Sequence, residues 1–142
     1  HRMAAAVDIS SAQKLIEEDV DDFSRDRTAY EGLPDKPDDV EIFRINGPFF
    51  FGAAARIGDV LGELRTPPKA FILRMGNVPL IDASGAAALE KFINDAARNG
   101  TRTILSNVQP GVRKVLDDLG LSRKSSVTIV KNLEKALIAA RA

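Results

Sequence analysis

The sequence predicts an α/β domain in which helices pack against a mixed, mostly parallel sheet of four to five strands. Short apolar runs of strand length alternate along residues 40–142 with longer segments whose apolar residues recur at helical spacing. The expected order of elements is β-β-α-β-α-β-α-β-α, and strands that are joined through helices pair in parallel. The hydrophobic content of 44% and the charged content of 28% are ordinary for a globular domain.

An acidic leader precedes this domain. Gly32–Asp39 (GLPDKPDD) contains two prolines, a glycine and three aspartates and cannot continue a helix, so we place the domain boundary after it. Residues 1–39 are predicted to be a linker with a short helix within residues 10–27. Leader and domain carry opposite charge: residues 1–41 have 12 acidic and 5 basic side chains, net −7, whereas residues 42–142 have 8 acidic and 15 basic, net +7.

The first half of the domain is predicted to contain three strands and one helix. Val40–Asn46 (VEIFRIN) alternates apolar and polar residues, which is typical of a strand. A Gly47-Pro48 turn separates it from Phe49–Phe51, which we expect to form a second short strand. A helix from Gly52 to about Arg65 follows, and the compact apolar run Ala70–Met75 is expected to be a central buried strand.

The second half alternates helices and strands, bounded by proline and glycine stops at Asn99-Gly100, Pro110 and Gly120. The expected elements are a helix at Ser84–Arg98, a strand at Thr101–Ser106, a helix at Gly111–Leu119, a strand at Val127–Val130 and a helix at Asn132–Ala142.

The residue types present exclude several classes of function. The chain has no cysteine, so disulfides, thiol chemistry and zinc–cysteine sites are excluded. Its single histidine, His1, is either native or left from a tag, and it leaves no catalytic triad or multi-histidine metal site. Neither a GxxxxGK[ST] loop nor a GxGxxG pattern occurs, so any nucleotide site should be weak and unconventional. A basic domain can favour nucleic acid, nucleotides or the anionic cytoplasmic leaflet, and the alternative is an ordinary solvated surface. We expect no nucleic-acid partner.

The stretch Phe71–Phe92 predicts a candidate site where a buried strand passes through a short loop into a helix. Backbone N–H groups and the positive end of the helix dipole attract anions and polar partners at such a junction. The candidate ligand- or partner-binding residues are Asn77, Val78, Asp82, Ser84 and Gly85. Structural alternatives remain open for all five: an ordinary turn for the first two, an N-cap for Asp82, a first-turn residue for Ser84 and close packing for Gly85.

The motif Ile81-Asp82-x-Ser84-Gly85 after a buried strand resembles the signature of STAS domains, the fold shared by anti-sigma-factor antagonists and sulfate-permease-type (SulP) anion transporters. In the antagonists a phosphorylatable serine directly follows the aspartate, whereas this chain has Ala83. Asn46–Ala54 (NGPFFFGAA) and Asn77-Val78-Pro79 are similar to patterns of the transporter branch, as is the basic start of the chain (HRMA). The resemblance covers about residues 40–142 and implies a STAS-like fold.

The resemblance also implies a function. It points to the cytosolic regulatory and interaction domain of a SulP-type secondary transporter of sulfate or a related anion, at the cytoplasmic face of the inner membrane. In that family the domain carries no chemistry, so the resemblance implies no enzymatic activity and no cofactor. The implied partners are the membrane domain of the same transporter, a second subunit in a homodimer or a cytosolic protein, and in some members a nucleotide. The alternative is a free-standing, antagonist-like signalling protein that binds a partner kinase. Ala83 argues against this alternative and leaves Ser84 as a disfavoured phosphorylation site.

Phe49, Phe50 and Phe51 are candidate residues for interdomain docking. Alternation along a strand would place Phe50 on the opposite side from its two neighbours, so at least one ring must face solvent or another element. An exposed aromatic ring would favour docking against the membrane domain or a second subunit. The alternative is burial of the rings beneath the leader helix.

Overall fold

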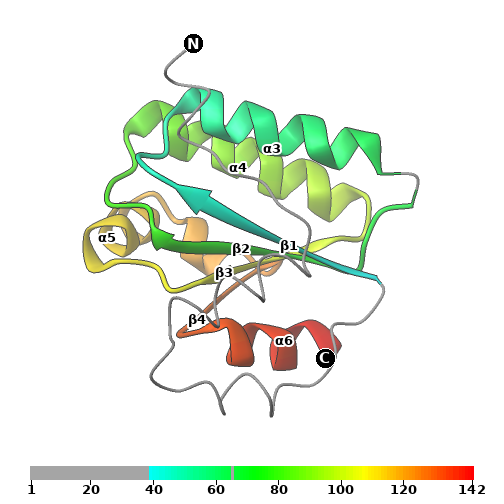
Figure 1. Cartoon of the computed structure of the whole chain (residues 1–142). Helices are drawn as coiled ribbons and strands as arrows, with labels where there is room; N and C mark the ends of the chain where they lie inside the picture. The colour runs from blue at the N-terminus through cyan, green and yellow to red at the C-terminus, as the bar shows by residue number, and fades with distance from the viewer. Residues whose placement is uncertain (1–38, 65) are drawn as a thin grey trace.

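The computed structural model describes residues 39–64 and 66–142, and the helix predicted within residues 10–27 lies outside them. The strands are β1 (Val40–Asn46), β2 (Ala70–Asn77), β3 (Arg102–Ser106) and β4 (Val127–Val130). The helices are α3 (Phe51–Glu63), α4 (Ala83–Arg98), α5 (Pro110–Asp118), the 3-10 helix η3 (Leu121–Arg123) and α6 (Leu133–Arg141). The strands form one sheet in the order β1-β2-β3-β4, and every neighbouring pair is parallel (Figure 1).

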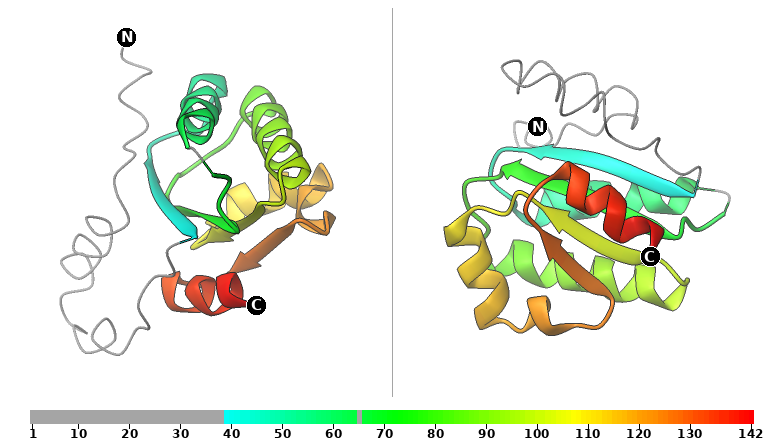
Figure 2. Two further views of the ribbon diagram at one scale, coloured as in Figure 1. Left: turned by 90° about the vertical axis from the view of Figure 1, so that its right-hand side faces the viewer. Right: turned by 90° about the horizontal axis from the view of Figure 1, so that it is seen from below.

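The helices cover the two faces of the sheet unequally. α3, α4 and α5 lie on one face and α6 lies alone on the other (Figure 2). The larger core, on the α3 and α4 side, includes Phe43, Phe71 and Phe92, whose rings pack against one another. The smaller core joins the opposite side of the strands to the apolar side of α6. None of the described helices combines the length and the apolar character needed to cross a bilayer.

One predicted element is wrong. Phe49–Phe51 is not a second strand, because only Phe49 makes an isolated parallel bridge, with Ile81, and α3 already begins at Phe51. Gly47, with φ 94°, turns the chain after β1, and the alanine-rich sequence that follows favours a helix over continued pairing. The described sheet is therefore entirely parallel rather than mixed. The other described bounds agree with the predicted ones to within two residues.

Candidate functional site

Asp82 begins α4 as its N-cap. Its backbone is extended (φ −95°, ψ 176°), and its Oδ1 accepts a hydrogen bond of 2.6 Å from the backbone N–H of Gly85. The carboxylate thus satisfies one of the N–H groups that a helix start leaves without an internal partner. Its negative charge also lies at the positive end of the helix dipole. The N-cap role therefore explains why an aspartate occupies position 82.

Gly85 is where the β1–α3 connection approaches α4. It is buried, and a Cβ atom at this residue would overlap the backbone carbonyl oxygen of Phe49 and lie 3.0 Å from its carbonyl carbon. Phe49 is held there because its N–H donates to the Leu80 carbonyl at 3.0 Å. Only a glycine lets these two backbones pass so closely, which is the close-packing explanation given from the sequence.

The loop before the junction is tied to the turn after β1. The Asn77 Nδ2 donates to Asn46 Oδ1 at 2.7 Å, and the Gly47 N–H donates to the Asn77 carbonyl at 2.9 Å. Asn77 is exposed and stays available to a partner, whereas the Val78 side chain is fully buried in the larger core. The burial of Val78 removes it from the surface that a ligand can reach.

Ser84 lines a groove between α3 and α4. These two helices run side by side over the sheet (Figures 1 and 2). Ser84 is exposed, and its hydroxyl makes no hydrogen bond with the described residues. The groove has a volume of about 580 Å³, and most of its lining side chains are small or apolar. It is lined by Ala55, Gly58, Asp59, Ser84, Ala87, Ala88, Lys91, Phe92 and Asp95.

Charged side chains occupy one end of this groove. Asp95 pairs with Lys91 at 2.9 Å and with Arg98, each one turn away on α4. The hydrogen bond from Lys91, helped by the positive charges of both partners, lowers the pKa of the Asp95 carboxyl below its ordinary value despite some desolvation. The groove therefore has an ionised end and a remainder lined mostly by small or apolar side chains.

The three phenylalanines of the proposed docking site do not share one environment. The Phe49 ring is fully buried in the larger core, because the Ile81 bridge turns it inward, so it is unavailable for docking. Phe50 is only partly buried, and the side chain of Phe51 lies outside the described part of the structure. Sequence reasoning missed Leu80, which is 46% exposed next to the bridge. Its neighbour Ile81 points inward, and period-two alternation would have pointed Leu80 outward.

A family model described as the STAS domain matches residues 34–136 of this chain. Among solved structures, a sulfate transporter family protein from Wolinella succinogenes is 39% identical, with a TM-score of 0.69, and the match covers 76% of this chain and 89% of that one. The STAS domain of a SulP transporter from Vibrio cholerae is 29% identical, with a TM-score of 0.68 and coverage of 80% and 89%.

A putative anti-sigma factor antagonist from Thermotoga maritima has a TM-score of 0.66 and coverage of 78% of this chain and 95% of that one. At 21% identity this likeness shows a shared fold alone. A comparison with curated proteins gives no match.

Proposed function

The chain belongs to the STAS domain family, and we propose that it is the cytosolic regulatory domain of a SulP-type secondary anion transporter. The similarity to the sulfate transporter family protein, over most of both chains, is the observation that carries this proposal. Ala83 adds to it, since the position that a kinase modifies in antagonists has no hydroxyl here. On this proposal the domain lies at the cytoplasmic face of the inner membrane, and the membrane part transports sulfate or a related anion.

The role we propose is binding rather than catalysis. The Asp82 carboxylate caps α4, and the described residues include no histidine that could act as a base for the Ser84 hydroxyl. An uncapped acid or an activated nucleophile would be needed for the common hydrolytic mechanisms. The junction therefore supports a non-enzymatic module whose function depends on the surfaces that it presents.

We place the contact with the membrane domain, or with a second subunit, at Phe50 and Leu80. Both belong to the paired connections at the carboxyl edge of the sheet, where Phe49 and Ile81 form their bridge. Their neighbours are fixed by backbone hydrogen bonds, so the two apolar side chains are presented by a rigid support. A partly exposed aromatic beside an exposed leucine is the kind of small apolar patch that marks a protein contact.

Sulfate uptake by the intact transporter tests this proposal. Phe50→Ala combined with Leu80→Ser should lower uptake at equal membrane abundance, while the melting temperature of the separately expressed chain changes little. Leu119→Ser, at the residue that follows α5, is the matched control, because Leu119 is also exposed, at 53%, and belongs to neither of the two connections that form the junction. If the double variant took up sulfate at the wild-type rate, the docking role of Phe50 and Leu80 would be contradicted. The family assignment would be unaffected.

The antagonist-like alternative makes a different prediction for Ser84. Its hydroxyl is exposed at the first turn of α4, so a kinase could reach it. Incubation of the chain with a partner kinase from the same organism should leave Ser84 unmodified if the transporter proposal is right. Stoichiometric phosphate incorporation that Ser84→Ala abolishes would favour the signalling role instead.

A further inference from the structure

The connections that follow β3 and β4 leave the sheet in opposite directions. Ser106 and Val130, the last residues of these strands, are register partners, so both strands end at the same level. The chain then passes from β3 to α5 on one face and from β4 to α6 on the other (Figure 2). Because α3 and α4 also lie on the α5 face, the described sheet has this single point of divergence. In open parallel sheets, ligands bind preferentially in the crevice that opens at such a point.

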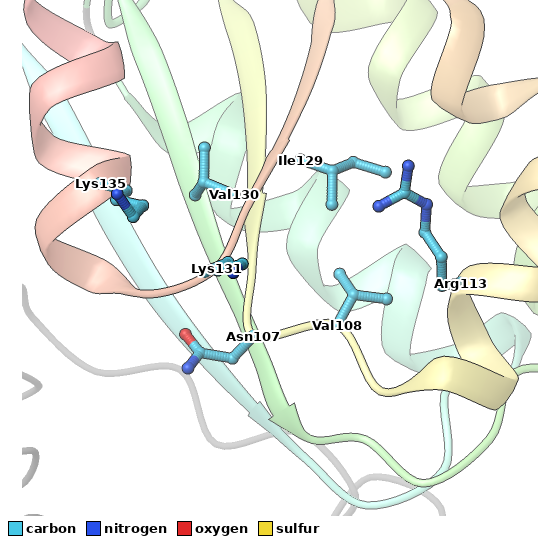
Figure 3. Close-up of a pocket in the computed structure, with 7 residues that line it drawn as sticks. All are labelled: Asn107, Val108, Arg113, Ile129, Val130, Lys131 and Lys135. Atoms are coloured by element: carbon cyan, nitrogen blue, oxygen red, sulfur yellow. The ribbon is translucent and has the colours of Figure 1, made fainter.

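A cavity of about 590 Å³ lies at this point of divergence (Figure 3). Ile129 packs against the larger core and Val130 against the smaller one, and both line the cavity. The cavity therefore reaches around the end of β4 from one face of the sheet to the other. Its volume falls within the range of small-molecule sites, about 300–1,000 Å³. Its lining consists of Asn107, Val108, Arg113, Ile129, Val130, Lys131 and Lys135, none of which belongs to the junction around Asp82.

The charge around this cavity is of one sign. Three cationic side chains line it, and no acidic side chain is among the described residues that do so. Lys131 and Lys135 are exposed, and neither forms an ion pair with another described residue. Arg113 pairs with Asp117 at 3.0 Å through its Nε alone, so its two terminal nitrogens make no hydrogen bond within the described part of the chain. A cleft lined by charge of one sign concentrates ligands of the opposite sign, so this cavity favours an anion.

The connection from β3 to α5 adds two polar features to the cavity. Asn107 lies in the left-handed region, with φ 61°, which few residues other than glycine and asparagine adopt. Its Oδ1 is buried without a hydrogen-bond partner among the described residues, which leaves a polar group for a bound molecule or water to satisfy. The Gln109 side chain does not cap α5 but donates to the Gly76 carbonyl at 2.8 Å. The first turn of α5, beside the cavity, therefore keeps N–H groups without a side-chain cap, and such groups also favour an anion.

We propose that this cavity binds a small phosphate monoester. A phosphate monoester carries a charge of about −1.5 to −2 at pH 7, which matches three surrounding cations better than the single charge of a carboxylate. Lysine ammonium groups bind phosphate as point charges, and the guanidinium of Arg113 offers paired donors to its oxygens. The aliphatic side chains of Val108 and Ile129 suit a short apolar group on the ester. None of the described lining residues is aromatic, so the cavity has no ring on which a nucleotide base would stack. The inference does not depend on the transporter assignment, because it rests only on this chain.

Titration of the full, isotopically labelled chain with monobutyl phosphate, followed by the backbone amide signals in NMR spectra at constant ionic strength, tests the inference. The signals of Val108 and Lys131 should shift and saturate, whereas that of Asp82 should stay in place. Pentanoate has the same alkyl chain with a single charge, so it should bind about two- to fivefold more weakly, the range expected for one exposed ion pair. Equal affinity for pentanoate would overturn the phosphate class, and equal affinity for inorganic phosphate would overturn the ester.

Variants with the same change in net charge locate the site. Lys131→Gln and Lys135→Gln should each weaken the binding of monobutyl phosphate about two- to fivefold. Lys114→Gln is the matched control, because Lys114 is an exposed lysine of α5 that does not line the cavity, and it should leave the affinity unchanged. Equal weakening in all three variants would show that only net charge matters and would overturn the inference. If one cavity variant fails to fold, the other makes the same comparison with the control.

The same titration distinguishes the sources of the phosphate group. If phosphatidylcholine vesicles that contain phosphatidic acid displace monobutyl phosphate at equal phosphate concentration, the monoester is a lipid headgroup; if they do not, it is a soluble compound. Both results keep the site. Tighter binding of adenosine monophosphate than of monobutyl phosphate would show that the cavity recognises a base and would overturn the inference. The absence of saturable shifts at millimolar probe, or shifts spread evenly over the domain, would overturn it as well.

Discussion

Replacing Gly85 with alanine should destabilise the domain, although alanine is usually the better residue in a helix. The backbone of Gly85 lies outside the left-handed region, so the φ angle itself admits alanine. The obstacle is steric, because the new Cβ would overlap the Phe49 carbonyl oxygen and lie 3.1 Å from Asp82 Oδ1. Relief requires movement of backbone, either of the β1–α3 connection or of the first turn of α4.

The magnitude follows from two opposing effects. Overpacking of a fitted site costs about 1–3 kcal/mol, and an obstacle made of backbone places Gly85 at the upper end. The helix preference of alanine over glycine offsets at most about 1 kcal/mol of this cost. We therefore expect a net loss of about 2 kcal/mol in the free energy of unfolding. For a domain of this size the melting temperature should fall by about 8–16 °C.

Urea denaturation of the purified chain measures this loss, with an unchanged m-value as the check that the unfolding reaction is the same. Gly58→Ala is the matched control, since Gly58 lies within α3 and a Cβ there meets nothing within 4 Å. The control should stabilise the domain by about 0.5–1 kcal/mol. If Gly85→Ala proved as stable as Gly58→Ala, the reasoning from close backbone approach would be refuted.

Three further predictions concern the cap, an ionised side chain and the leader. Asp82→Ala should cost about 1 kcal/mol in urea unfolding, whereas Asp82→Asn should keep most of the stability, because an amide oxygen still accepts from Gly85; equal losses would contradict the cap. The Ser122 hydroxyl and then Arg113 lower the pKa of the Asp117 carboxyl, so its stabilising contribution is present above the ordinary pKa and lost as pH falls through the lowered one. Ser122→Ala should raise that pKa in an NMR titration, and an unchanged value would refute the hydrogen bond of 2.6 Å as its cause. Deletion of residues 1–38 should leave a domain that unfolds cooperatively, and a loss of cooperativity would show that the leader is part of the core.

Much of the fold could be predicted from the sequence, because local patterns determine it. The alternation of apolar and polar residues predicted β1. The helical spacing of apolar residues and the Asn99-Gly100 stop predicted α4, and the Asp-x-Ser-Gly motif predicted the helix start that Asp82 caps. The resemblance to STAS domains, drawn from the same motif, is confirmed by the family match. The parallel pairing followed from the alternation of strands and helices.

The remaining features depend on contacts between distant segments. The Phe49 bridge needs Ile81, 32 positions along the chain, and no local pattern distinguishes it from a strand. The burial of Val78 in the larger core is likewise a property of the folded domain rather than of a local pattern. Arg74 lies inside an apolar run that predicts a buried strand, but only the register with Arg44 shows that two cations share one face. The groove beside Ser84 exists because two helices pack at a distance that their sequences do not encode locally.

The coding sequence upstream of His1 tests the central proposal most directly. If the domain regulates a SulP-type transporter, the same reading frame should encode a series of apolar segments of about 20 residues, each long enough to cross a bilayer. A start codon near Met3, with no such segments before it, would contradict the proposal and favour a separate signalling protein.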